Sequence, residues 1–229
     1  TLVVGSNTAL GTGTLTAAAG TTLDSNAPVT LGNDAVLNGA LTVGGSNALA
    51  LNGAISGIGG LVKNGGASLT LGGNNTYLGS TALNAGGLIL VANTALGSGA
   101  LNAAGGTTLD ASTALTVNNA IILAGNLGIG GTADLTLGGN VNGVGSLTKN
   151  GAANLTLNAA NGFLGGTTLN AGTLTLGNAA ALGLGNLTVG GAATLDNNTA
   201  LSVGNNAVLN AALTVAGGND LALGGLLTG

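Results

Sequence analysis

The stretch LTKNGAANLTLNAANGFLGGTTLNAGTLTLGN, residues 147–178, repeats a short phrase of Leu-Thr-Leu separated by Asn, Ala and Gly. In each such triplet the first and third residues fall on one side of an extended chain, whereas a helix would need a spacing near 3.6 residues. Gly and Asn recur every few residues and supply the backbone freedom and small volume that sharp corners require. The stretch therefore predicts short strands joined by tight corners.

The rest of the chain repeats the same phrase at two periods. TTLD at 21–24 returns as TTLD at 107–110 and as ATLD at 193–196, so the copies lie 86 residues apart. Within a copy, apolar triplets start about 20 residues apart, with two further triplets between them, which describes coils of a parallel β-helix. We expect an all-β solenoid over residues 1–229, with copies at 1–86, 87–172 and a partial copy at 173–229, and about four coils in each full copy.

Burial of leucine is the expected source of stability. One triplet buries only two side chains, but coils stacked at ~4.8 Å pair their backbones and join the leucines into a dry column. Each buried Leu contributes roughly 1.5–3 kcal/mol. The inward positions are predicted to include Leu23, Leu109 and Leu195. The outward positions are predicted to include Thr22, Thr108 and Thr194.

The composition is far from that of an ordinary soluble domain. Only 3% of the 229 residues are charged, six Asp and two Lys, whereas 45% are hydrophobic and 47 are Gly. Soluble domains carry about 25% charged residues. The chain has no His, Cys, Glu, Arg or Trp, so it offers neither thiolate ligands nor the usual base for a serine nucleophile. A net charge of −4 argues against nucleic acid as a partner, because phosphate binding needs a basic surface.

Targeting and membrane signals are not visible in the sequence. Without Met, the chain is expected to be a processed product, a fragment or a part of a larger polypeptide. No basic and apolar leader opens it. No apolar run approaches the ~18 residues of a membrane-spanning helix, because Gly, Asn and Thr interrupt every few positions.

Two segments resemble a known family. LVKNGGASLTLGGNNTYLGSTALNAGGLIL (61–90) and LTKNGAANLTLNAANGFLGGTTLNAGTLTL (147–176) are similar to the passenger-associated transport repeat of bacterial autotransporters, with its Leu-x-Lys-x-Gly, Leu-Thr-Leu and Asn-Thr-Tyr-x-Gly elements. Phe163 stands in place of the usual Tyr, and Asn161-Gly162 in place of Asn-Thr. The resemblance implies a right-handed parallel β-helix that is exported and displayed or released outside the cell.

Candidate sites are few. Asp24, Asp110 and Asp196 share one register, and Asp134 and Asp220 share another, but members of a set lie too far apart to share a metal ion, so we expect them to accept turn N–H bonds. The GGTADLTL stretch at 130–137 matches a calcium-binding nonapeptide only faintly.

Other polar and aromatic side chains are expected to serve the fold. We interpret Lys63 and Lys149 as solvated corners, and Tyr77 and Phe163 as packing residues. The sequence thus predicts no catalytic, cofactor-binding or metal-binding residue. Outward Thr12, Thr14 and Thr16 could belong to an ice-binding array, but their register partners are Ser98, Ala100 and Asn102 in the second copy, so the array does not persist.

The sequence favours a structural role. We expect a stalk, spacer or adhesive segment of an exported passenger on a bacterial cell surface, without enzymatic activity. The alternative is a self-assembling extracellular filament, and a polysaccharide-acting enzyme ranks third because too few charges exist to build its groove. The terminal stretches TLVV and LALGGLLTG have no polar cap, so we expect end-to-end self-association or continuation into a longer passenger. A host or cell-surface receptor is a further possible partner.

Overall fold

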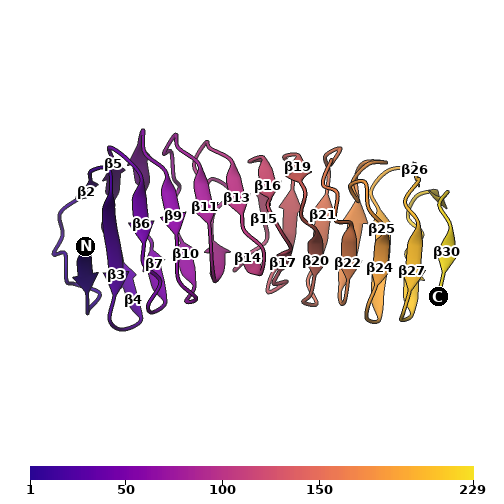
Figure 1. Cartoon of the computed structure of the whole chain (residues 1–229), viewed down its shortest axis with the longest axis horizontal. Helices are drawn as coiled ribbons and strands as arrows, with labels where there is room; N and C mark the ends of the chain where they lie inside the picture. Colours follow the sequence, from indigo (N-terminus) through magenta and orange to yellow (C-terminus); the bar gives the residue numbers. More distant parts are fainter.

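A computed structural model describes all residues from 1 to 229 as a stack of coils that winds along one long axis (Figure 1). It contains strands and turns and no helix, and every strand pairing is parallel. Most strands are three residues long, as the Leu-Thr-Leu phrase predicts. The all-β parallel solenoid expected from the sequence is therefore confirmed.

Each turn visits three faces in a fixed order. Face 1 holds an eight-stranded sheet and, toward the C-terminal end, a two-stranded sheet. Its strands are β1 (Leu2–Val4), β3 (Thr21–Ser25), β6 (Leu41–Val43), β9 (Leu61–Lys63), β11 (Thr81–Leu83), β13 (Leu101–Ala103), β16 (Ile121–Leu123), β19 (Val141–Gly143), β26 (Leu201–Val203) and β29 (Leu221–Leu223).

Face 2 is one uninterrupted sheet of 11 strands and so counts the turns of the solenoid. Its strands are β4 (Val29–Leu31), β7 (Leu49–Leu51), β10 (Leu69–Leu71), β12 (Gly87–Leu90), β14 (Thr107–Ala111), β17 (Leu127–Ile129), β20 (Leu147–Lys149), β22 (Thr167–Leu169), β24 (Leu187–Val189), β27 (Ala207–Leu209) and β30 (Leu227–Thr228).

Face 3 holds a three-stranded sheet and a six-stranded sheet, separated by two turns without strand structure. Its strands are β2 (Leu15–Ala17), β5 (Ala35–Leu37), β8 (Ile55–Gly57), β15 (Leu115–Val117), β18 (Leu135–Leu137), β21 (Leu155–Leu157), β23 (Thr173–Leu176), β25 (Ala193–Asn197) and β28 (Leu213–Val215).

The core is the column of inward side chains between the three faces. It comprises 49 buried apolar residues. Leu23, Leu109 and Leu195 are at most 1% exposed, as predicted, whereas the threonines that precede them lie on the outside. Because parallel pairing places Leu over Leu in successive coils, the column is continuous, and its burial is the main stabilising contribution.

The 86-residue copies are not aligned along one face, because each copy spans slightly more than the expected four coils. The equivalent TTLD, TTLD and ATLD strands are β3, β14 and β25, which lie on face 1, face 2 and face 3. On face 1, four pairings lead from β3 through β6, β9 and β11 to β13, and β14 then follows on the next face. One copy therefore spans four turns and one additional face, and each copy is rotated by a third of a turn.

Two equivalent glycines show why the corners need Gly. Gly57 and Gly143 have φ of 104° and 116°, a region that other residues rarely adopt. A Cβ atom at either position would lie 2.3 Å from the carbonyl oxygen of the preceding coil, Leu37 or Leu123. No residue other than Gly has a positive φ in this chain.

Candidate functional site

Two buried asparagines occupy equivalent positions in the two segments that resemble a known repeat. Asn75 accepts the Ile55 N–H at its Oδ1 (2.8 Å) and donates from Nδ2 to the Ala95 carbonyl (2.7 Å). Asn161 repeats both bonds with Val141 and Ala181 at the same distances. Each amide thus connects three successive coils where the sheet is interrupted. Because every polar atom is paired, the amide substitutes for the missing backbone ladder.

The aromatic side chains lie two residues further on, and both are fully buried. The Tyr77 hydroxyl lies 2.5 Å from the Thr81 hydroxyl. Burial raises the pKa of Tyr77 to about 12. Phe163 has no hydroxyl, and the equivalent Thr167 donates instead to the Leu182 carbonyl (3.2 Å). The predicted packing role matches this geometry, since neither ring is available as an exposed stacking platform.

The lysines correct the expectation of solvated corners. Lys63 and Lys149 are 0% exposed and take the inward third position of a strand, in register with apolar residues of the neighbouring coils. Lys63 Nζ donates to the carbonyls of Asn64 (2.7 Å), Gly65 (2.8 Å) and Ala85 (3.3 Å). An ammonium group can be buried here because these carbonyls replace its water. The sequence carried the signal: the LVK triplet places Lys63 where LTV places a buried Val.

Lys149 repeats this arrangement by donating to the carbonyls of Gly151 and Ala171. Burial lowers the pKa of Lys63 and of Lys149, and nearby carboxylates oppose the shift, Asp24 for Lys63 and both Asp110 and Asp134 for Lys149. Each lysine therefore fastens one turn to the next rather than presenting a free amine. We find no geometry in which it would act as a base on an external substrate.

Asp24, Asp110, Asp134 and Asp196 accept backbone N–H bonds at turns, as predicted, whereas the Asp220 side chain accepts none. Asp24 accepts the backbone N–H of Ser25 (2.8 Å) and of Ser46 (3.1 Å), and the Ser46 hydroxyl (2.6 Å). The bond from the Ser46 hydroxyl is the largest cause of the lowered pKa of Asp24. Asp110 makes the same three contacts with Ala111 and Thr132. Each of these two carboxylates accepts hydrogen bonds from its own coil and from the next coil.

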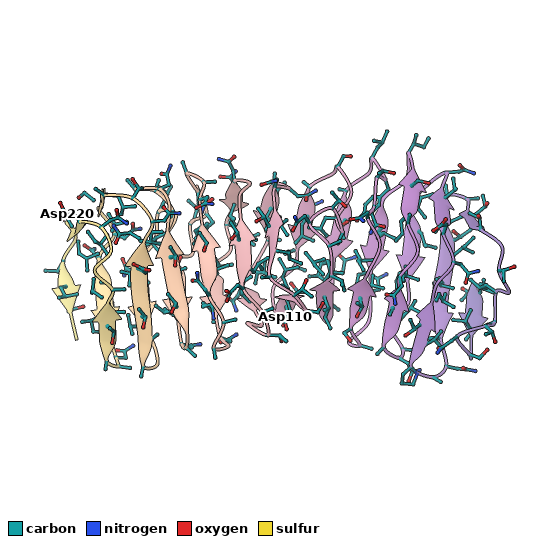
Figure 2. All side chains as sticks on the ribbon, turned by 180° about the vertical axis from the view of Figure 1, so that it is seen from behind. Asp110 and Asp220 are labelled. Carbon is teal, nitrogen blue, oxygen red and sulfur yellow. The ribbon has the colours of Figure 1, made fainter.

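Members of the two carboxylate sets are also separated around the axis. Asp24, Asp110 and Asp196 lie on β3, β14 and β25, and so on faces 1, 2 and 3. Asp110 of this set and Asp220 of the other also lie far apart along the solenoid (Figure 2). The one-third rotation of each copy explains why residues in one sequence register do not form a file. No group of three or more Asp, Glu, His or Cys side chains gathers anywhere in the described chain.

A second set of equivalent asparagines anchors a loop that takes the place of a strand and recurs every 86 residues. Asn33 donates from Nδ2 to the carbonyls of Gly11 (3.0 Å) and Gly13 (2.7 Å). Asn119 and Asn205 repeat this pair of bonds with the loops at 91–100 and 177–186. The first loop lies beside the first strand of face 2, at the end of that sheet, and the other two loops interrupt face 3 and face 1. Sequence reasoning missed these residues, although their spacing of 86 residues marks them.

Outward threonines of successive coils are stacked in a row. Their spacing is about 20 residues, so a comparison at 86 residues does not show the row. On face 3, Thr116 pairs with Thr136 and Thr136 with Thr156, 20 residues apart. The file then continues through Thr175 to Asp196. It is a single row, and Thr175 donates its hydroxyl to Asn154 (3.0 Å). Cross-strand pairs of this kind stabilise a sheet.

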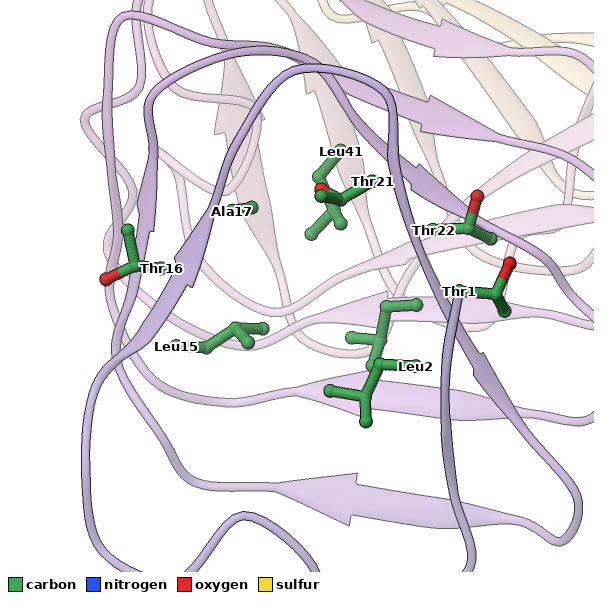
Figure 3. A pocket seen from close by; sticks show the side chains of 9 residues that line it. Thr1, Leu2, Leu15, Thr16, Ala17, Thr21, Thr22 and Leu41 are labelled. Carbon is green, nitrogen blue, oxygen red and sulfur yellow. The ribbon is translucent and has the colours of Figure 1, made fainter.

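One hollow opens at the first coil, where the apolar column is uncovered. It has a volume of about 230 Å³, and Leu2, Leu15 and Leu41 face it together with small and threonine side chains (Figure 3). No charged side chain lines it. Its chemistry is that of the core itself, so it would accept another coil rather than a polar substrate.

Comparison with known proteins agrees with this architecture. Residues 61–90 and 147–176 match the family model described as passenger-associated-transport-repeat. A stretch of 39 residues is 56% identical to the Neisserial autotransporter lipoprotein NalP of two strains of Neisseria meningitidis serogroup B. That match covers 17% of this chain and 4% of NalP. No solved structure matches the chain.

Two segments of the chain thus match the passenger-associated transport repeat, and the β-helical resemblance drawn from the sequence is confirmed. The Lys, Asn and aromatic residues of each repeat are bound to backbone or packed in the core. Such repeats on a β-solenoid are typical of non-catalytic passenger segments. No helix in the structure is long and apolar enough to cross a membrane.

Proposed function

We propose that this chain, with its two passenger-associated transport repeats, is a structural segment of an exported autotransporter-like passenger and acts as an extracellular stalk or spacer. The observation that carries the proposal is the uninterrupted 11-stranded sheet of face 2, on which both repeats are built. At ~4.8 Å per strand, 11 turns extend over roughly 50 Å. The buried side-chain polar atoms of the rod, except Asn197 Oδ1, are hydrogen-bonded within it, which suits a load-bearing spacer. Its few charges leave no electrostatic site.

The proposed role does not include an enzymatic activity. The chain has no His or Cys, and its two lysines are buried against carbonyls. The carboxylates of Asp24 and Asp110, which accept the Ser46 and Thr132 hydroxyls, are also held by turn N–H groups. An adhesive role would reside in exposed side chains that differ between copies, not in the repeat residues. The bacterial cell surface or its surroundings is the location that the relationship to an autotransporter supports.

A display experiment tests the stalk. The chain is inserted between an outer-membrane anchor and a fluorescent module on bacterial cells, and the distance of the module from the membrane is measured by energy transfer to a membrane dye. We expect an increase in distance of roughly 50 Å. A deletion of residues 107–126, one turn, should shorten it by ~4.8 Å. A module that remains at the membrane, or is never exposed to antibody, would contradict the proposal.

A second candidate is a filament subunit, favoured by the exposed apolar residues of the end coils. Leu2 and Val3 in β1 and Leu226 and Leu227 near β30 are 44%, 54%, 66% and 57% exposed. Stacking of another coil on either end would cover them and pair the free strand edges. Negative-stain microscopy at micromolar concentration separates the candidates, because fibres one solenoid wide favour the filament and single short rods favour the stalk.

A further inference from the structure

Asparagine is followed directly by glycine at six places in the chain. In this dipeptide the side-chain amide is readily lost, because glycine has no Cβ to hinder the approach of its backbone nitrogen to the asparagine carboxamide. The six asparagines are Asn38, Asn52, Asn64, Asn142, Asn150 and Asn161. Since the dipeptide is the same in every case, large differences in reactivity between the sites must come from the fold.

Two groups of the dipeptide must be able to move for the amide to be lost. The carboxamide has to rotate toward the backbone, and the N–H of the following glycine has to give up its proton. A hydrogen bond to either group holds it in place, and the reaction must then wait for a local opening of the structure. The hydrogen bonds and burial at each site therefore rank the six pairs.

The pair at Asn161 is held at both groups. Asn161 is 4% exposed, and its carboxamide is bonded to Val141 and Ala181 in the coils on either side. Gly162 N–H donates to the Val141 carbonyl (2.9 Å). Loss of this amide would require three hydrogen bonds of the repeat to break first.

The pair at Asn38 is held at neither group. Asn38 lies at the corner between β5 and β6, and its exposed carboxamide makes no hydrogen bond within the chain. Gly39 is half-buried, and its N–H has no acceptor, whereas the Asn38 N–H is bonded to the Ala17 carbonyl (2.9 Å). The backbone is thus fixed up to the asparagine, and the two groups that must react remain unbonded.

Two further pairs meet only part of these conditions. The carboxamide of Asn52 and the N–H of Gly53 are both unbonded, but Gly53 is buried. The Asn142 carboxamide is unbonded, but Gly143 belongs to β19 and is held in register with Leu123 of the preceding coil. We therefore expect both to react more slowly than Asn38.

The remaining two pairs are equivalent in the 86-residue register and differ in one bond. Oδ1 of Asn64 and of Asn150 each accepts a bond from an asparagine of the next coil at 2.9 Å. Gly65 N–H is unbonded, whereas Gly151 N–H donates to a carbonyl of the preceding coil (3.0 Å). This pair of sites isolates the effect of the glycine N–H.

We propose that Asn38 is a site of spontaneous deamidation in the folded chain, whether or not the rod acts as a stalk. The Gly39 nitrogen attacks Cγ of Asn38 and closes a succinimide ring, and the side-chain nitrogen leaves as ammonia with the proton from Gly39. Water then adds across one of the two imide C–N bonds and gives aspartate or isoaspartate. Either product adds one negative charge to a chain whose net charge is −4.

Peptide mapping of the folded full chain after incubation at neutral pH tests the proposal. Trypsin cleaves the denatured chain after its two lysines, so peptides 1–63, 64–149 and 150–229 each carry two of the six pairs. Electron-transfer fragmentation locates each new acid and distinguishes isoaspartate from aspartate. Asn38 should convert about tenfold or more faster than Asn161, whose amide is bonded on both sides. Asn64 should convert faster than Asn150.

The same incubation in guanidinium chloride is the control for sequence effects. Without the fold, all six pairs should convert at similar rates. A folded chain in which Asn38 converts no faster than Asn161 overturns the proposal. So does a ratio between these two rates that is the same in the folded and the unfolded chain, because the sequence and not the structure would then set it.

Asn38→Gln provides a second test, because its longer side chain would have to close a larger ring. Circular dichroism should be unchanged, since the side chain is exposed and unbonded. Formation of acid in peptide 1–63 should fall to the slower rate of Asn52. If it continues at the rate of the wild type, Asn38 is not the reactive site.

Discussion

The two transport repeats differ at one buried group, the hydroxyl of the aromatic side chain. The difference shows which hydrogen bonds are common to both coils and which one is replaced. In the first repeat the Tyr77 and Thr81 hydroxyls satisfy each other, whereas Phe163 leaves Thr167 to bond the Leu182 carbonyl. The Asn75 and Asn161 contacts are the same in both repeats. The amide bridge is therefore the fixed element, and the aromatic hydroxyl is dispensable where the threonine finds another acceptor.

The repeats also lie on different faces. The loop that carries Tyr77 runs along face 3, and the loop that carries Phe163 runs along face 1, yet their hydrogen bonds agree to within 0.1 Å at the asparagines. A coil contacts only its neighbours, so a motif that satisfies those neighbours works on any face. Substitutions made at equivalent positions of the two repeats test whether the face matters.

The largest effect is expected for Asn75→Ala and Asn161→Ala. Each leaves one buried N–H and one buried carbonyl without a partner, which costs about 1–3 kcal/mol per group. Urea unfolding followed by circular dichroism should give equal losses for the two variants. Asn74→Ala, at an exposed neighbour, is the control and should change little. Losses that differ between Asn75 and Asn161 by more than about 1.4 kcal/mol, a factor of ten in stability, would show that the face matters.

Lys63→Met and Lys149→Met come next. Removal of a charged donor from backbone carbonyls costs about 1.5–3 kcal/mol. We expect the larger loss at Lys63, which has three carbonyl acceptors against two at Lys149. The loss is read from the same urea titration. If both variants unfold like the wild type, the lysines do not fasten the turns.

Thr81→Val and Thr167→Val should separate the two repeats. Thr81→Val leaves the buried Tyr77 hydroxyl unpaired and should cost about 1–3 kcal/mol, whereas Thr167→Val removes one bond worth about 1 kcal/mol. Adding Tyr77→Phe to Thr81→Val should recover stability toward the level of Thr167→Val. Failure of the double variant to recover would mean that the hydroxyl pair is not the source of the difference.

The smallest effect concerns alkaline pH. The pKa of Tyr77 is about 12 in the folded chain and about 10 when unfolded, so the unfolded state loses its proton first. Stability from this group is complete below pH 10 and is lost as pH rises through 12, by about 1 kcal/mol at pH 11. Because burial also lowers the pKa of both lysines, the measurement is the difference in stability between wild type and Tyr77→Phe. If the stability difference between wild type and Tyr77→Phe is the same at pH 8 and at pH 11, the raised pKa of the buried Tyr77 is contradicted.

Much of the fold was readable from the sequence because the solenoid is built from local rules. Alternation in LTL placed Leu23, Leu109 and Leu195 inside, and the Asp at the end of each of these strands was correctly assigned to turn bonds. The prediction for the lysines is wrong because their strand position, and not their charge, decides where they lie. Carbonyls that solvate an ammonium come from residues of two coils, and no single stretch reveals them.

By itself the sequence determined the strands, the corners, the inward column and the repeat family, since these depend on period-2 alternation and on residues within one segment. Only the tertiary structure decided the rotation of each copy by a third of a turn. Equivalent residues of the copies lie 86 positions apart in the sequence, whereas residues stacked on one another in neighbouring coils lie about 20 positions apart. Because 86 is not a whole multiple of the coil length, equivalent residues do not stack. Which equivalent residues share a face therefore follows from the pairing register between coils, which is set by the packing of the column.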